Sequence, residues 1–136
     1  MPADQIRFLA SCATTEHFDE GVYLFREGEK ADVFYLILQG RVSLDTFVPG
    51  RGHKGIQTVG AGEILGWSWL YPPYLWHFDG RVLRPTDAIT FDAPCVREKC
   101  DQDHVFGHEL LKRFTNIIIQ RLQATRLQML DVYAVK

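Results

Sequence analysis

Three side chains that can bind metal ions recur at helical spacing in the last third of the chain. Cys100, His104 and His108 are four residues apart, so on an unbroken helix they would share one face, as metal ligands do. Asp103 is a favourable N-cap residue, however, and would end one helix and begin the next between Cys100 and His104. We therefore expect a buried cysteine and partly exposed histidines here, and no metal site.

Catalytic motifs are absent from the sequence. It contains no nucleophile elbow, no P-loop and no zinc-protease motif. Glu63 and Glu109 are a conceivable carboxylate pair, but nothing in the pattern brings them together. We expect a protein that is not an enzyme.

The composition predicts one globular domain of 136 residues. The chain is 46% hydrophobic and 24% charged, with a formal net charge of −2, which argues neither for nor against a nucleic-acid partner. No apolar run reaches the ~18 residues of a membrane-spanning helix, and the N-terminus lacks the pattern of a signal peptide. We expect a cytoplasmic location and no membrane partner.

The chain has three cysteines, Cys12, Cys95 and Cys100. An odd number at wide spacing does not suggest a disulfide framework and favours a reducing compartment. Cys95 and Cys100 could pair with each other or bind a metal, but buried free thiols are the expectation.

Most of the chain has the pattern of short strands. A helix over the first dozen residues, with Ile6, Phe8 and Leu9 on its apolar face, ends in 11–15. Strands follow at 22–25, 33–38, 42–47, 56–59, 81–84 and 88–91. Turns are expected at 39–41 and 85–87, and a loop at 49–55. Many short strands at regular spacing predict a sandwich or barrel.

From Cys95 the period becomes helical. A short helix is expected over 95–102, and a second from His104 to about Val135. One apolar stripe of the second helix can lie on the barrel: Phe106, Leu110, Phe114 and Ile117. We expect the basic side chains of this helix, Arg121 among them, on a solvated face.

A second stripe on this helix has heptad spacing. It comprises Leu111, Ile118, Thr125 and Val132 at one position and Thr115, Leu122 and Met129 at the other. β-Branched residues at the first position with Leu or Met at the second favour a parallel two-stranded coiled coil. The pattern predicts a homodimer; the alternative is a helix that only covers its own barrel.

One segment carries a family signature. Residues 24–42, LFREGEKADVFYLILQGRV, contain the pattern G-x-x-A-D-x-x-Y-x-I-x-x-G-x-V, and Gly60–Gly66 and Gln120–Thr125 add two shorter matches. The chain resembles the cyclic-nucleotide-binding domain of the Crp/Fnr-type bacterial regulators and of cyclic-nucleotide-dependent kinases and channels. The resemblance implies a mainly β fold with flanking helices: a double-stranded β-helix (jelly-roll, cupin-like) barrel over about 14–94, a short N-terminal helix, and C-terminal helices over about 95–135. It also implies one domain over 1–136 with a regulatory role in signal transduction.

The resemblance also implies a site. In the family, a phosphate-binding cassette holds a cyclic nucleotide with backbone N–H groups, an acidic residue for the ribose, and an arginine for the phosphate. The candidate ligand-binding residues carried over are Gly62, Glu63, Ile64, Leu65, Gly66, Trp67, His77, Arg81 and Thr125. The implied ligand is a cyclic nucleotide or a related small molecule.

This chain departs from the family pattern at both polar groups of the site, the acid that binds the ribose and the arginine that binds the phosphate. Trp67 stands where the acid is expected, His77 or Phe78 stands at the arginine position, and Arg81 is displaced by several residues. The aromatic segment 67–78 either lines a pocket for a flatter, less charged ligand or a protein, or plugs the pocket with its own core.

Two functions follow and remain open. One is a non-enzymatic sensor domain with weak or altered nucleotide binding. The other is a ligand-free dimerisation or protein-interaction subunit that kept the fold and lost the pocket. Because the chain ends where the bacterial regulators begin their helix-turn-helix module, we expect no direct nucleic-acid binding.

Overall fold

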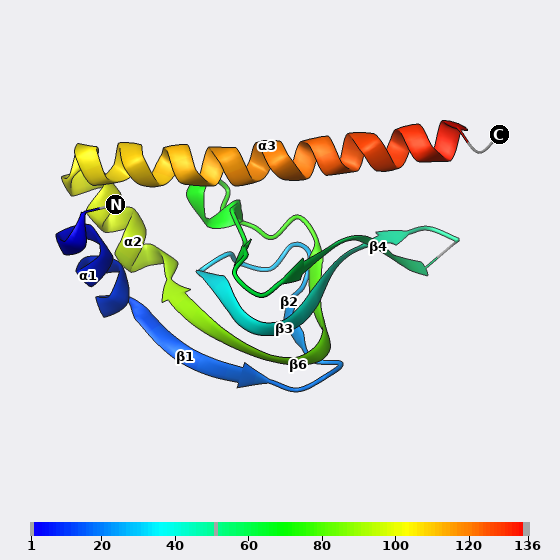
Figure 1. Cartoon of the computed structure of the whole chain (residues 1–136), viewed down its shortest axis with the longest axis horizontal. Helices are drawn as coiled ribbons and strands as arrows, with labels where there is room; N and C mark the ends of the chain where they lie inside the picture. Colours follow the sequence, from blue (N-terminus) through cyan, green and yellow to red (C-terminus); the bar gives the residue numbers. More distant parts are fainter. Residues whose placement is uncertain (1, 51, 135–136) are drawn as a thin grey trace.

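Two long strands carry the sheet of this protein. The computed structural model describes residues 2–50 and 52–134. Its elements, in chain order, are α1 (Ala3–Ser11), β1 (Ala13–Phe18), β2 (Tyr23–Phe25), β3 (Val33–Val48), β4 (Gly52–Gly60), β5 (Ile64–Leu65), the 3-10 helix η1 (Ser68–Leu70), β6 (Asp79–Asp92), α2 (Ala93–Gln102) and α3 (His104–Ala134) (Figure 1). The six strands form one antiparallel sheet in the order β1-β6-β3-β4, with β2 added to β6 and β5 to β3.

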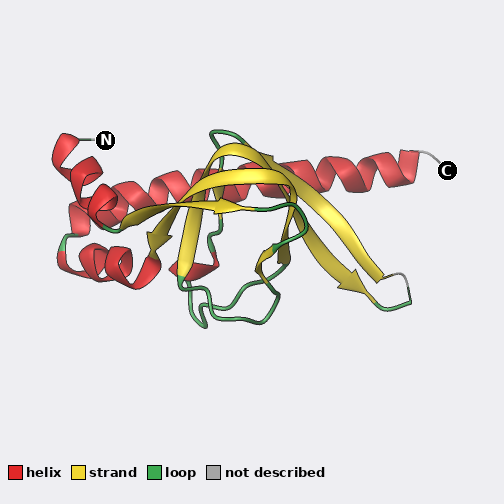
Figure 2. Cartoon of the chain, turned by 90° about the horizontal axis from the view of Figure 1, so that it is seen from below, coloured by secondary structure: helices red, strands yellow, loops and turns green. Residues whose placement is uncertain are grey.

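The sheet curls beneath α3, with α1 and α2 beside the first turns of that helix (Figures 1 and 2). The predicted mainly β, jelly-roll-like fold with a short N-terminal helix and C-terminal helices is confirmed. The apolar stripe predicted to lie on the barrel is also confirmed, since Phe106, Leu110 and Phe114 are buried and Ile117 packs against the core.

The two turns predicted at 39–41 and 85–87 are wrong. Both segments lie inside continuous strands, β3 and β6, and the pairing between these strands shifts register at this point. A Cβ on Gly40, whose φ is +113°, would lie 2.7 Å from the Pro85 carbonyl oxygen. The glycine and proline signals therefore mark the two sides of one bend, where two backbones approach each other closely.

Two smaller boundaries also differ from the prediction. Residues 13–15 belong to β1 and do not end the first helix, and β4 begins at Gly52, inside the predicted loop. In α1, Ile6 is 54% exposed while Gln5 is buried, so the apolar face predicted for this helix is wrong at Ile6. Phe8 packs edge-on against Phe106 of α3, with ring centroids 5.6 Å apart.

Asp103 separates the two C-terminal helices, as predicted. Its carboxylate accepts a hydrogen bond from the Phe106 amide at 3.1 Å, and this bond lowers the pKa of Asp103. The long helix then runs unbroken to Ala134. Among the described residues, no helix is long and apolar enough to cross a membrane.

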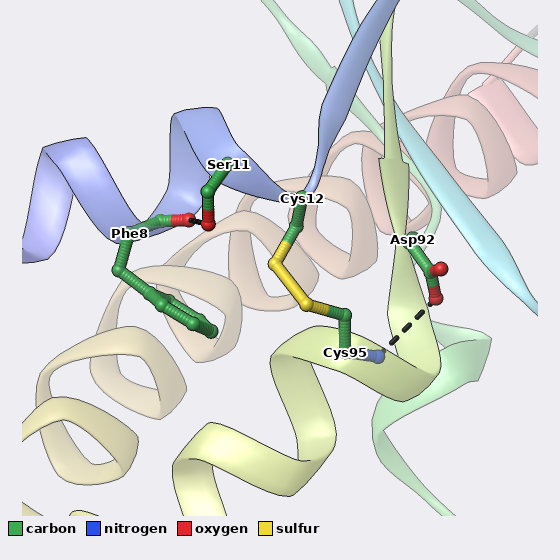
Figure 3. The surroundings of a disulfide bond; sticks show 5 residues. All are labelled: Phe8, Ser11, Cys12, Asp92 and Cys95. Carbon is green, nitrogen blue, oxygen red and sulfur yellow. Dashed lines mark hydrogen bonds between the residues drawn. A yellow bond between two sulfur atoms is a disulfide. The ribbon is translucent and has the colours of Figure 1, made fainter.

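The expectation of a free thiol is wrong at Cys95. Cys12, at the end of α1, and Cys95, in the first turn of α2, form a disulfide with their Cα atoms 6.2 Å apart (Figure 3). Pairing of Ala13 with Phe91 across β1 and β6 brings the two cysteines together. The partners are 83 residues apart, so their spacing carried no sign of the pair. Cys100 remains a free thiol, and burial raises its pKa.

Candidate functional site

The turn from Gly60 to Gly66 uses several of its own polar groups. The Gly62 amide, in a residue with φ +83°, donates to the Ile37 carbonyl at 2.7 Å, and the Glu63 amide donates to the Gly60 carbonyl at 3.1 Å. The Glu63 side chain accepts a bond from the Gly60 amide at 3.0 Å. Because these groups hold the turn together, the amides of Gly62 and Glu63 are not directed at a ligand.

Gly66 marks the closest approach of two parts of the site. Its φ is +104°, and a Cβ there would lie 2.8 Å from the ring of Trp76. Trp76 is 4% exposed and stacks on Phe25, with centroids 3.7 Å apart. Only glycine gives Trp76 room to lie flat inside the barrel.

A second tryptophan of the aromatic segment is also core. Trp69 is fully buried; its ring stacks on Phe34 at 4.5 Å and meets the edge of Phe114 at 5.1 Å. Trp69 and Trp76 therefore fill the interior and do not line an open pocket.

Trp67 behaves differently. It is half-buried, stacks on the exposed His77 with centroids 5.0 Å apart, and meets Phe78 edge-on at 6.3 Å. The His77 Nδ1 is hydrogen-bonded to the buried Ser68 hydroxyl at 2.9 Å. Trp67 and His77, two of the candidate ligand-binding residues, thus form a stacked pair of rings.

Arg81 is engaged elsewhere. Its Nε donates to Asp45 at 3.0 Å, and the same carboxylate, only 1% exposed, also accepts a bond from the Ser43 hydroxyl. A buried carboxylate needs such a partner, so Arg81 compensates a charge of the protein itself. Among the described residues that line the two cavities below, Arg81 does not occur.

Two cavities lie between the barrel and α3. The smaller, about 180 Å³, has a mostly apolar wall made by Leu44, Ile56, Gln57, Trp67, Phe78, Ile118, Arg121 and Leu122. The larger, about 450 Å³, lies beside the Gly60–Gly66 turn and is lined by Gln57, Thr58, Val59, Gly62, Glu63, Ile64, Ile117, Gln120, Arg121 and Ala124. The candidate residues are therefore divided: the turn faces one cavity and Trp67 the other.

Arg121 lines both cavities and links α3 to the barrel. Its guanidinium donates to the Ile64 carbonyl, and the Gln57 side chain donates to the Arg121 carbonyl at 2.8 Å. Burial lowers the pKa of Arg121, an effect that the nearby Glu63 opposes. The expectation that Arg121 lies on a solvated face is wrong. No local signal distinguished it, because its contacts come from distant segments.

The three potential metal ligands that recur at helical spacing in the sequence are not brought together. Cys100 lies on α2, while His104 and His108 are exposed on α3, beyond the break at Asp103. No group of three or more potential metal ligands gathers in the part of the chain that the structure describes. The side chains of Thr125, Met129 and Val132 lie outside the described residues.

Comparison with known proteins agrees with this fold. Over 67 residues the chain is 30% identical to human cGMP-dependent protein kinase 2, a stretch that covers 48% of this chain and only 9% of the kinase. A putative cyclic nucleotide-binding protein from Geobacter metallireducens has a TM-score of 0.80 at 25% identity, covering 90% of this chain and 88% of its own.

A cyclic nucleotide-binding domain from Methylobacillus flagellatus has a TM-score of 0.85 at 22% identity, covering 96% and 74% of the two chains. The sequence model of the cyclic nucleotide-binding domain matches residues 15–103, well over half of the chain. The chain therefore belongs to the cyclic nucleotide-binding domain family.

Proposed function

We propose that this chain is a non-enzymatic sensor domain that binds cyclic AMP and cyclic GMP weakly and prefers a flatter, less charged ligand. The observation that carries the proposal is the Trp67–His77 stack. Trp67 stands where the resemblance expects the acid for the ribose, and His77 is, with Phe78, one of the two candidates for the position of the arginine for the phosphate.

The expected loss of nucleotide affinity is large. A charge-assisted hydrogen bond is worth about 1.5–3 kcal/mol, so losing the phosphate and ribose bonds together weakens binding by roughly two orders of magnitude or more. Arg81, the nearest displaced cation, is bound to the buried Asp45. The apolar cavity of about 180 Å³ is also smaller than the roughly 300–1,000 Å³ of typical ligand sites.

The position of this cavity supports a sensing role. Three residues of α3, Ile118, Arg121 and Leu122, form part of its wall. A ligand that enters it touches the long helix directly and can change the equilibrium between positions of that helix. A planar, weakly charged molecule suits a wall built from Trp67 and Phe78.

Titration calorimetry with cyclic AMP and cyclic GMP tests the proposal. We expect a dissociation constant well above 1 µM for both nucleotides. The matched variant Trp67→Glu with His77→Arg reinstates the acid and the arginine and should gain at least about tenfold in affinity. Micromolar or tighter binding by the unmodified chain would contradict the proposal.

A second function is favoured by exposed apolar side chains of α3. Large apolar side chains are exposed there, with Leu122 67% and Leu111 41% exposed. Such side chains suit a ligand-free subunit that forms a homodimer or binds a protein partner. A cytoplasmic location and the absence of direct nucleic-acid binding remain predictions under both functions.

A further inference from the structure

The Cys12–Cys95 disulfide lies in the wall of an open surface pocket. This pocket, of about 630 Å³, is lined by both cysteines together with the carboxylate residues Glu16, Asp32 and Asp92. Among its described lining residues there is no lysine, arginine or histidine. Cys12 is 8% exposed and Cys95 is half-buried, so a small molecule reaches the disulfide from the pocket side, where it meets a negative potential.

The segments on the two sides of Cys12 differ in how firmly they are held. On the barrel side, the Asp92 amide donates to the Cys12 carbonyl at 2.8 Å, and β1 pairs with β6 along its whole length. On the helix side, the described ring contacts of α1 are those of Phe8 with Phe106 and with the Lys99 ammonium. The disulfide is thus the one covalent link between the end of α1 and the first turn of α2 (Figure 3).

We propose that Cys12–Cys95 is a reversible redox site that is reduced by a dithiol without net negative charge. A thiolate of the dithiol attacks one sulfur, a mixed disulfide forms, and the Cys12–Cys95 bond breaks. The second thiolate of the reductant then displaces the remaining cysteine. Two electrons and two protons pass from the dithiol to the two cysteines, and the reductant leaves as a disulfide.

Reduction acts on the helical part of the molecule. The barrel keeps its strand pairing, while α1 is then held by non-covalent packing alone, in which Phe8 and Leu9 contact the core. Because α2 leads directly into α3 at Asp103, the redox state changes how the base of the long helix is anchored. In a reducing compartment, disulfides of this accessible kind are usually transient and redox-sensing.

The reduction rate of the full-length chain tests the electrostatic part of the proposal. The probes are cysteamine, 2-mercaptoethanol and 3-mercaptopropionate, compared at equal thiolate concentration, with free cysteines trapped by alkylation and counted by mass spectrometry. At low salt the cationic thiol should react fastest and the anionic thiol slowest, with a spread of about fivefold. The spread should shrink in 1 M salt, where the Debye length falls to about 3 Å.

Matched variants assign the effect to the pocket. Glu16→Gln and Asp32→Asn should each reduce the spread, whereas Glu20→Gln, which changes an exposed carboxylate outside the pocket lining, should leave it unchanged. A rate that does not depend on thiol charge would overturn the proposal. So would a rate independent of thiol concentration, because the disulfide would then react only after global unfolding.

Hydrogen exchange tests the structural consequence. On reduction, amides of α1 should exchange faster while those in β3 and β6 stay protected, and Cys100→Ser, which keeps the disulfide, should behave like the unmodified chain in both states. Unchanged protection of α1 after complete reduction would contradict the proposed effect on anchoring. Neither readout needs a bound ligand, so the result is independent of the proposed sensor function.

Discussion

Individual residues of the aromatic segment have separate roles. The sequence left open whether this segment plugs or lines the pocket. Trp69 and Trp76 are core residues, while Trp67 and Phe78 form part of a cavity wall. The segment is therefore part core and part cavity wall, and we propose that the chain's own specificity lies at Trp67.

Truncation of two tryptophans should have unequal effects on stability. Trp76→Ala removes a buried, stacked ring and should lower the free energy of unfolding by about 3–5 kcal/mol. Trp67→Ala removes a half-buried ring and should cost about 1–2 kcal/mol, since part of its surface is already in water. Urea unfolding of both variants measures the difference. Equal, large losses would show that Trp67 is a plug as well.

We expect the pair of His17 and Asp87 to make the stability of the barrel depend on pH. Its Nδ1 lies 2.7 Å from Asp87, and this hydrogen bond raises the pKa of the imidazole above the usual 6.5. A raised folded-state pKa stabilises the fold fully below the unfolded value, and this contribution is lost as pH rises through the folded value.

Between pH 5.5 and 8, the unmodified chain should therefore lose more stability than Asp87→Asn. Urea unfolding at the two pH values checks this, with the effect small because both side chains are exposed. An identical loss in both proteins would rule out a contribution from the pair.

At the scale of elements, local signals were read correctly and long-range ones were not. Asp103 specified the break between α2 and α3 because an N-cap acts on amides two or three residues away. Gly40 and Pro85 were each read as a turn because a bend shared by two paired strands depends on a partner distant in sequence. The same limit hid Arg121 and the disulfide. The proposed departures at Trp67 and at His77 or Phe78 rest on residue type and register within one segment, so the sequence alone suggests them.

The bend at Gly40 leads to a prediction about β3. Gly40→Ala would combine a positive φ with a Cβ only 2.3 Å from the Thr86 hydroxyl oxygen. Gly28→Ala has a positive φ of +87° but nothing within 4 Å of the added Cβ. We expect a loss of about 1–2 kcal/mol for Gly28→Ala and a clearly larger loss for Gly40→Ala, measured by urea unfolding. Equal losses would mean that β6 moves aside without cost.

The exposed leucines of α3 lead to a prediction about association. Leu122 belongs to the heptad stripe and is 67% exposed, whereas Leu127 is 60% exposed but lies off the stripe. If the stripe forms a coiled coil, Leu122→Glu should dissociate the dimer and Leu127→Glu should not. Sedimentation at tens of micromolar separates the cases. A 15.6 kDa monomer for the unmodified chain would count against the dimer altogether.

At the scale of the whole molecule, the disulfide contributes to stability as well as to anchoring. Crosslinking residues 83 apart removes much of the freedom of the unfolded chain, and loss of a native disulfide typically costs about 2–5 kcal/mol. Urea unfolding with and without a reductant should show a loss in that range. Cys100→Ser is the control, because it keeps the disulfide and should show the same dependence. No change on reduction would mean that the crosslink constrains the unfolded chain little.

The same bond also alters what a break in the chain does to the molecule. From Cys12 to Cys95 the polypeptide is a covalent ring that contains all the described strands of the sheet and the first residues of α2. Helix α1 precedes the ring, and the rest of α2 and all of α3 follow it. Cleavage after the exposed Lys54 would open the ring without producing two separate molecules. The cut protein should migrate as one species without reductant and as two fragments with it, so a nicked barrel stays whole for as long as its surroundings keep the bond oxidised.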